Sequence, residues 1–212
     1  EDTLWQRVSG AVYSSFAASG TYRYRYVYDR RRNNIDDYPT CNLSVRRDAF
    51  KEAGGFHTNY WPGEDTELCL TLTKKCGYRI VYDPLVEVHH HRRSLWNGYF
   101  KQVTQYALHR GFFVKKFPQT SRRPAYFIPS LFTFGILTGW ITWWIPVLFA
   151  VYCAVVMMYV LFLAGCSFLV SPRLTLLTML GTALTHIAYG VYFIAGLCAP
   201  RLSKEEESTR PA

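Results

Sequence analysis

A short acidic motif is the residue group in this sequence that best fits chemistry on a hydroxyl. Trp61-Pro62-Gly63-Glu64-Asp65 brings two carboxylic acids to the point where a turn ends and a helix is expected to begin. The free N–H groups and the dipole at a helix N-terminus stabilise an ionised carboxylate. Such a carboxylate at the edge of a cleft can take a proton from a hydroxyl nucleophile. Acids at this position also serve simply as helix caps, so the motif alone leaves both interpretations open.

A basic cluster is the second group with chemical potential. His89-His90-His91-Arg92-Arg93 directly follows a predicted strand. Imidazole can bind a divalent metal, and guanidinium groups suit phosphate oxygens. A zinc site built from these histidines and a cysteine has no supporting spacing. The alternative interpretation of the cluster is a solvated basic turn.

Hydrophobic periodicity and turn residues predict the elements that hold these groups. Helices are predicted over about 1–18, 47–53, 64–75 and 95–106. Strands are predicted over 22–28, 40–45, 78–82 and 85–89, with a charged loop over 30–37. Gly54-Gly55 ends the second helix and Pro62-Gly63 opens the third. The acidic motif therefore begins a helix, and the basic cluster follows the last strand.

Two long uncharged runs predict a membrane module after the polar part. No charged residue occurs from 125 to 172, and only His186 interrupts the run from 174 to 200. A helical crossing needs roughly 20 apolar residues. Spans are therefore expected over about 126–142, 146–170 and 174–198, the third being the weakest. The basic residues just before residue 125 predict that the polar part is cytoplasmic and that the third crossing leaves the tail outside.

Charge and cysteine content narrow the class of partner. The formal net charge of +9 lies almost entirely in the polar part. Next to a membrane module, this excess favours a lipid surface and phosphorylated substrates. Tyr22 to Tyr26 alternate with arginines as in single-stranded nucleic-acid binders, but sugars also stack on aromatic rings, and we expect no nucleic-acid partner. The six cysteines contain no CxxC pair, so buried reduced thiols are expected.

The order and spacing of several short motifs resemble family 2 glycosyltransferases over about residues 40 to 111. The matching segments are Cys41–Arg47, Gly54–Phe56, Gly63–Leu68, Gly77–Ile80, Asp83-Pro84 and His89–His91. The resemblance implies an α/β fold, in which residues 1–93 form the C-terminal, acceptor-side part of a GT-A domain. Residues 94–124 would form an amphipathic interfacial helix and basic linker, 125–200 two to three transmembrane helices, and 201–212 a polar tail.

The same resemblance implies roles for individual residues. Asp65 would be the catalytic base, with Glu64 supporting it. His90, or in the other register His89, would complete a metal or diphosphate site. The residues implied in substrate binding are Asn42, Arg92, Arg93, Gln102 and Arg110.

The implied activity is an inverting transfer from a nucleotide sugar to a polyprenyl-phosphate or glycan acceptor at the cytoplasmic face of the plasma (inner) membrane. The family's N-terminal βαβ half and its Asp-x-Asp metal motif do not occur in these residues, and Asp36-Asp37 has the wrong spacing and context. The donor half is thus expected upstream of Glu1. The divalent metal, Mg or Mn, is expected only with that half, and the isolated chain is expected to be inactive.

Two alternatives to this activity remain open. One is a processive polysaccharide synthase that threads its polymer through the spans. Processive members often carry Gln-x-x-Arg-Trp on the interfacial helix, whereas here Gln102 is followed by Gln105 and Tyr106 at the last two positions. The other alternative is a non-catalytic membrane scaffold.

Overall fold

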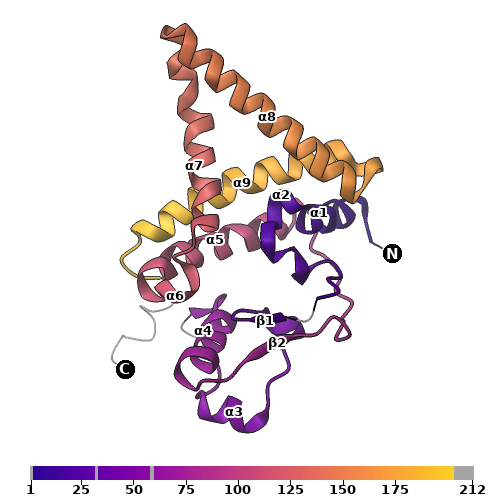
Figure 1. Cartoon of the computed structure of the whole chain (residues 1–212), viewed down its shortest axis with the longest axis vertical. Coiled ribbons are helices and arrows are strands. Elements are labelled where there is room, and N and C mark those ends of the chain that lie inside the picture. Colours follow the sequence, from indigo (N-terminus) through magenta and orange to yellow (C-terminus); the bar gives the residue numbers. More distant parts are fainter. Residues whose placement is uncertain (1, 32, 58–59, 203–212) are drawn as a thin grey trace. The chain divides into compact units, whose positions relative to one another are not determined.

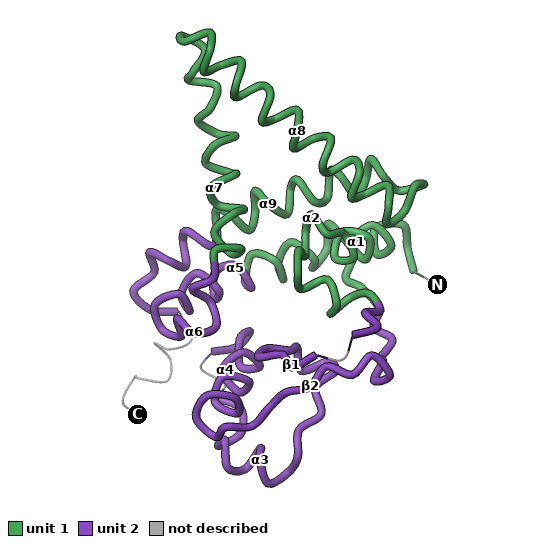
Figure 2. The backbone as a smooth tube through the Cα atoms, viewed as in Figure 1, with its two compact units in different colours: residues 1–27, 91–104, 124–192 green, residues 28–90, 105–123, 193–212 purple. Residues whose placement is uncertain are grey.

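The computed structural model describes residues 2–31, 33–57 and 60–202, which form two compact units (Figure 2). The first unit contains residues 1–27, 91–104 and 124–192. The second contains residues 28–90, 105–123 and 193–212. Helices α5 (Tyr99–Lys116) and α9 (Thr175–Cys198) begin in the first unit and end in the second. Most of the predicted tail, residues 203–212, lies outside the described residues.

The polar part of the first unit begins with α1 (Leu4–Ser14) and α2 (Phe16–Ser19). Thr3 and Gln6 form a capping box at the start of α1, which satisfies backbone N–H groups that have no partner within the helix. The apolar face of α1 joins Leu95 and the first two turns of α5 in one core. Its buried members are Val8, Val12, Leu95, Tyr99 and Val103. The predicted helix at the N-terminus is confirmed.

The predicted strand over residues 22–28 is wrong. Gly20–Arg25 form a 3-10 helix, η1. The ring of Tyr22 stacks on Tyr126 with centroids 5.7 Å apart, and the ring of Tyr26 stacks on Tyr13 at 4.7 Å. Alternating aromatic residues favour a strand only when a neighbouring strand is available, and here aromatic packing on helices replaces it.

The membrane module of the first unit consists largely of three apolar helical segments (Figure 1). They are α7 (Pro124–Thr138) with the 3-10 turn η5 (Gly139–Trp144), α8 (Pro146–Val170), and η6 (Pro172–Leu174) leading into α9. All three are long and apolar enough to cross a membrane. α7 and α8 meet at η5, where Trp143 and Trp144 are exposed, as expected for aromatic anchors.

The second unit holds the small sheet and the acidic motif. β1 (Asn33–Ile35) pairs antiparallel with β2 (Ile80–Tyr82), with Asn34 opposite Val81. η2 (Thr40–Asn42), α3 (Arg47–Glu52), α4 (Glu64–Leu70), a π-helical extension η4 (Thr71–Lys75) and α6 (Pro118–Ser121) complete the unit. The buried members of its core are Ala49, Ala53, Leu68 and Leu72. The predicted helices over 47–53 and 64–75 are confirmed, as is the strand within 78–82.

Two further strand predictions are wrong, and one strand was missed. Residues 43–46 and 85–90 have no ladder partner, and 40–42 form the 3-10 turn η2. Asn42 Nδ2 donates to the Val86 carbonyl at 3.0 Å, a side-chain contact between segments predicted as strands. β1 lies inside the segment predicted as a charged loop. Within the described residues the sheet has two strands, and this arrangement does not confirm a partial GT-A domain.

The cysteines are free thiols in both units. Cys69 is buried, and its Sγ donates to the Tyr38 carbonyl at 3.7 Å. The expectation of buried thiols is wrong for Cys41, Cys153 and Cys198, which are exposed.

Candidate functional site

The acidic pair is held tightly at the start of α4 in the second unit. Gly63 precedes the helix, and a Cβ there would lie 2.9 Å from the Phe113 ring and from the Tyr60 carbonyl, so the position requires glycine. Glu64 Oε2 accepts a hydrogen bond from the Gly63 N–H at 2.9 Å. Asp65 Oδ1 accepts from the Thr66 N–H at 2.7 Å. Both carboxylates are half-buried, so each combines a fixed position with access to solvent.

A buried ion pair lies beside this acidic pair. Arg110, on α5, places Nη2 3.1 Å from Asp37 Oδ2, and the two side chains are 2% and 7% exposed. The same Nη2 donates to Thr66 Oγ1 at 3.3 Å and to the Tyr106 hydroxyl at 2.6 Å. Thr66 Oγ1 in turn donates to Asp37 Oδ1 at 3.3 Å. Charges removed from water need such complete pairing, so this network fixes α5, α4 and the Asp37 loop together within the unit.

The surroundings of Asp65 change its acidity. Burial raises the pKa of the Asp65 carboxyl above its usual value, and the negative charges of Asp37 and then Glu64 raise it further. The Thr66 N–H and the Arg110 guanidinium act in the opposite direction. A carboxylate with a raised pKa is a stronger base, which suits it to accept a proton.

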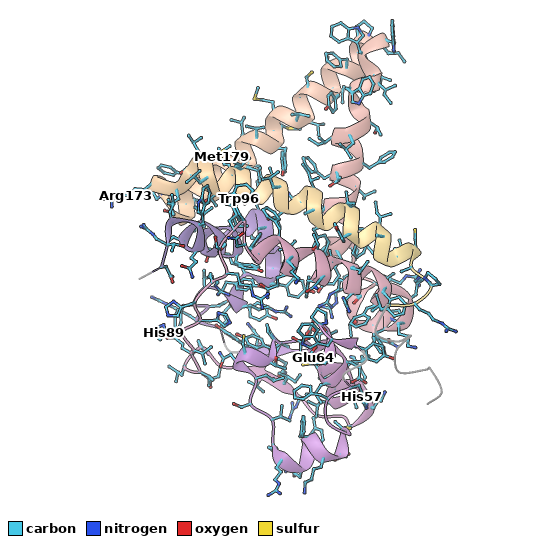
Figure 3. The ribbon with its side chains drawn as sticks, turned by 180° about the vertical axis from the view of Figure 1, so that it is seen from behind. His57, Glu64, His89, Trp96, Arg173 and Met179 are labelled. Atoms are coloured by element: carbon cyan, nitrogen blue, oxygen red, sulfur yellow. The ribbon has the colours of Figure 1, made fainter. Side chains whose placement is uncertain are left out.

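The histidines predicted as metal ligands lie elsewhere in the second unit. His89 and His90 are exposed, in a segment without regular secondary structure. Figure 3 shows His89 and Glu64 on separate parts of the unit, so the structure does not bring them together. No three His, Cys, Asp or Glu side chains within the described ranges gather as a metal site. The described residues thus offer no set that fits the predicted metal, and we derive no step through it.

The remaining predicted binding residues lie in the first unit, around a stack of tyrosines. The Arg92 guanidinium lies 5.4 Å from the Tyr13 ring centroid and 5.1 Å from that of Tyr26. The Tyr13 hydroxyl donates to Gln102 Oε1 at 3.4 Å. Arg93 is exposed, and its carbonyl accepts from Ser9 Oγ at 2.6 Å.

Aromatic faces, rather than an acid, hold the Arg92 guanidinium. No carboxylate among the described residues pairs with Arg92, which is half-buried. The flat face of a guanidinium makes cation–π contacts with aromatic rings, and the N–H groups at its edge stay available for hydrogen bonds. That edge is suited to an anion such as a phosphate.

Sequence reasoning missed Asp37. It treated Asp36-Asp37 as part of a charged loop, whereas Asp37 is 5% exposed and is the ion-pair partner of Arg110, 73 residues away. Asp36 forms a separate, partly exposed pair with Arg123. The signal available in the sequence was the position of these acids between Ile35 and Tyr38, whose apolar side chains draw the segment toward a core.

Comparison with known proteins shows a weak similarity between part of this chain and a glycosyltransferase. A segment of the chain is 28% identical over 81 residues to the glucosyl-dolichyl phosphate glucuronosyltransferase of Haloferax volcanii. The match covers 29% of this chain and 26% of that protein, about a quarter of its length. No protein-family model matches the chain, and no solved structure matches it. Membership of family 2 and the GT-A fold therefore stay predictions.

Proposed function

We propose that this chain is the acceptor-side part of a membrane-bound, inverting glycosyltransferase in which Asp65 is the catalytic base. The observation that carries the proposal is the position of Asp65 at the start of α4, half-buried beside the Asp37–Arg110 ion pair, with a raised pKa. The likeness to a glucuronosyltransferase supports sugar transfer as the reaction class. The apolar helices support an acceptor presented at a membrane.

The proposed step needs one free carboxylate oxygen. Asp65 Oδ1 is occupied by the Thr66 N–H, and within the described residues Oδ2 has no hydrogen bond. Oδ2 accepts the proton of the acceptor hydroxyl as the hydroxyl oxygen attacks the anomeric carbon. The bond from that carbon to the nucleoside diphosphate breaks in the same displacement, which inverts the anomeric centre. This proposal assigns donor binding and a divalent metal to none of the described residues.

In this proposal Arg110 positions the base rather than binding substrate. Its guanidinium is engaged by Asp37, Thr66 and Tyr106, and its side chain is 2% exposed. The negative charge of Asp37 raises the basicity of Asp65, while Arg110 keeps that charge in place. The pair thus tunes the base and fixes the helix that carries it.

The acceptor is proposed to be lipid-linked through a phosphate. Arg92 presents the edge of a stacked guanidinium, and it belongs to the same unit as α7 and α8. The relative from Haloferax volcanii is named for a dolichyl-phosphate-linked substrate, which supports the same chemistry. The basic residues before α7 support a cytoplasmic active site at the plasma membrane.

The catalytic role is tested with Asp65→Asn, made in the gene that encodes the whole protein. Membranes from these cells are incubated with labelled nucleotide sugars, and label in the organic-extractable lipid is counted. The amide keeps the size of the side chain but cannot take the proton, so turnover should fall by about 10²- to 10⁴-fold. Asp48→Asn, which removes an exposed acid on α3 paired with Arg46, should leave turnover unchanged. Near-normal activity of Asp65→Asn would reject the proposal.

A further inference from the structure

Helix α9 has the length and composition of a membrane span, but its contacts place it differently. With η6 it forms a run of 27 residues from Pro172 to Cys198. If it crossed the bilayer after α8, its C-terminal end would emerge on the opposite side from Arg173. That end would then lie on the side of η5, the turn between α7 and α8. The contacts of its two halves can be examined separately, one in each unit.

The first half of α9 packs on polar-part helices of the first unit. Leu174, Leu177 and Tyr189 pack against the core of Val8, Val12, Leu95, Tyr99 and Val103. The Tyr99 hydroxyl lies 2.9 Å from Thr185 Oγ1, and His186 Nε2 lies 3.0 Å from the Ala17 carbonyl. Figure 2 shows α1 beside this part of α9. These partners precede the first span in the chain. His186 also contacts both spans, because its carbonyl accepts from Thr133 Oγ1 of α7 at 3.1 Å and its Nδ1 lies 2.9 Å from the Tyr159 hydroxyl of α8.

The second half of α9 packs on the second half of α5 in the second unit. The Cα of Gly196 lies close to the Leu108 carbonyl, and the Cα of Gly111 lies close to the Phe193 carbonyl, with no room for a Cβ at either glycine. Beyond the helix end, Lys115 Nζ donates to the Ala199 carbonyl at 2.6 Å. Leu202 is buried with Phe112 and Phe113. These partners also precede the first span, and this part of α5 carries Arg110.

We propose that α9 does not cross the bilayer but lies along its surface, with both ends on the side of the polar part. A helix that spans alone separates its ends by the hydrocarbon thickness, roughly 30 Å. Segments on one side of the membrane cannot contact both ends of such a helix. The apolar runs then give two crossings, α7 and α8, and residues 199–202 return to the side of Asp65.

The two faces of α9 suit this position. Its inward face carries small and hydroxyl residues, which permit close helix packing. The buried members of that face include Thr178, Gly181, Thr182 and Thr185. The outward face is apolar, with Leu176 79%, Leu180 48%, Val191 47% and Ile194 44% exposed. Their spacing places them on one side of the helix, and the lipid interface is the partner of this face, as it is for other surface-lying helices.

Cysteine labelling in sealed vesicles of known orientation tests the topology independently of any activity. Three variants of the whole protein each carry one cysteine, at native Cys41, at Arg201→Cys or at Trp144→Cys. Cys41 marks the polar part and Trp144, 84% exposed, marks the turn between α7 and α8. A membrane-impermeant maleimide should label Cys41 and Arg201→Cys from one face and Trp144→Cys from the other. Detergent should expose all three.

Two results would overturn the topology. One is labelling of Arg201→Cys from the same face as Trp144→Cys. The other is no labelling of Arg201→Cys from either face, because Arg201 is exposed in the structure. A nitroxide on Val191→Cys tests the occupant of the outward face. Electron paramagnetic resonance that places the nitroxide at the depth of the lipid headgroups supports the assignment. A dipolar coupling between the nitroxides of two protein copies would instead assign the face to a second copy of this chain.

Discussion

Two arginines of this chain, Arg110 in the second unit and Arg92 in the first, have contrasting surroundings. Arg110 is 2% exposed and is neutralised by Asp37. Arg92 is half-buried between two tyrosine rings, and no carboxylate among the described residues pairs with it. A buried charge with a complete set of partners holds a structure together. A guanidinium that stacks on aromatic rings keeps the N–H groups at its edge available for hydrogen bonds to a ligand. The contrast supports the proposal that Arg110 has a structural role and that Arg92 binds an anionic group of the acceptor.

The largest expected effect comes from breaking the buried pair. Arg110→Ala removes the cation that neutralises the buried charge of Asp37, which should lower the free energy of unfolding by about 3–5 kcal/mol. Chemical denaturation of the purified protein in detergent measures this loss. Replacing both partners, Asp37→Leu with Arg110→Met, should recover most of it, because an apolar pair carries no desolvation cost.

The exposed pair between Arg46 and Asp48 is the control for this measurement. Arg46→Ala should change stability little, because water screens charges at the surface. A similar loss in Arg46→Ala and Arg110→Ala would show that burial is not what distinguishes the pairs. Equal losses of stability in Arg110→Ala and in the double variant would show that the buried charge of Asp37 is not the cause.

A smaller effect, on the KM for the acceptor, is expected from replacing Arg92, which stacks on Tyr13 and Tyr26. Arg92→Gln removes the charge and the planar fork, so the KM for a lipid-phosphate acceptor should rise about tenfold or more. Arg92→Lys should recover only part of the loss, because an ammonium group neither stacks nor binds two oxygens in parallel. Arg7→Gln removes one exposed positive charge from α1 in the same unit and is the matched control. An equal rise in KM for Arg7→Gln would show that Arg92 acts only through the net positive charge of the unit and does not bind the acceptor directly.

The smallest expected effect is a shift in pH dependence. The charge of Asp37 raises the pKa of Asp65, so Asp37→Asn should bring that pKa down toward its ordinary value. In the proposed mechanism Asp65 must be deprotonated to act as the base, and the acid limb of the kcat/KM profile should therefore move to lower pH. Asp36→Asn, which alters the neighbouring acid paired with Arg123, should leave the limb in place. A limb that moves to higher pH or stays fixed in Asp37→Asn would contradict the tuning role.

Local sequence patterns were sufficient to predict most of the α-helices and the apolar segments. The uncharged runs predicted α7, α8 and α9, and the Pro62-Gly63 turn predicted a helix beginning at Glu64. These features depend on residues within a few turns of one another. Their hydrogen bonds form within one segment, so the sequence pattern alone is informative.

The strands and the candidate site depended on tertiary structure. A strand needs a neighbour, and residues 43–46 and 85–90, which lack one in the described sheet, did not form ladders despite favourable patterns. Asp37 and Arg110 are 73 residues apart, and the sequence around neither residue predicts that they pair. The sequence by itself determined where most of the α-helices lie, where the chain is apolar and that two acids begin α4. Only tertiary structure decided which charges are buried together and which surface α9 covers, because both depend on contacts between segments far apart in the chain.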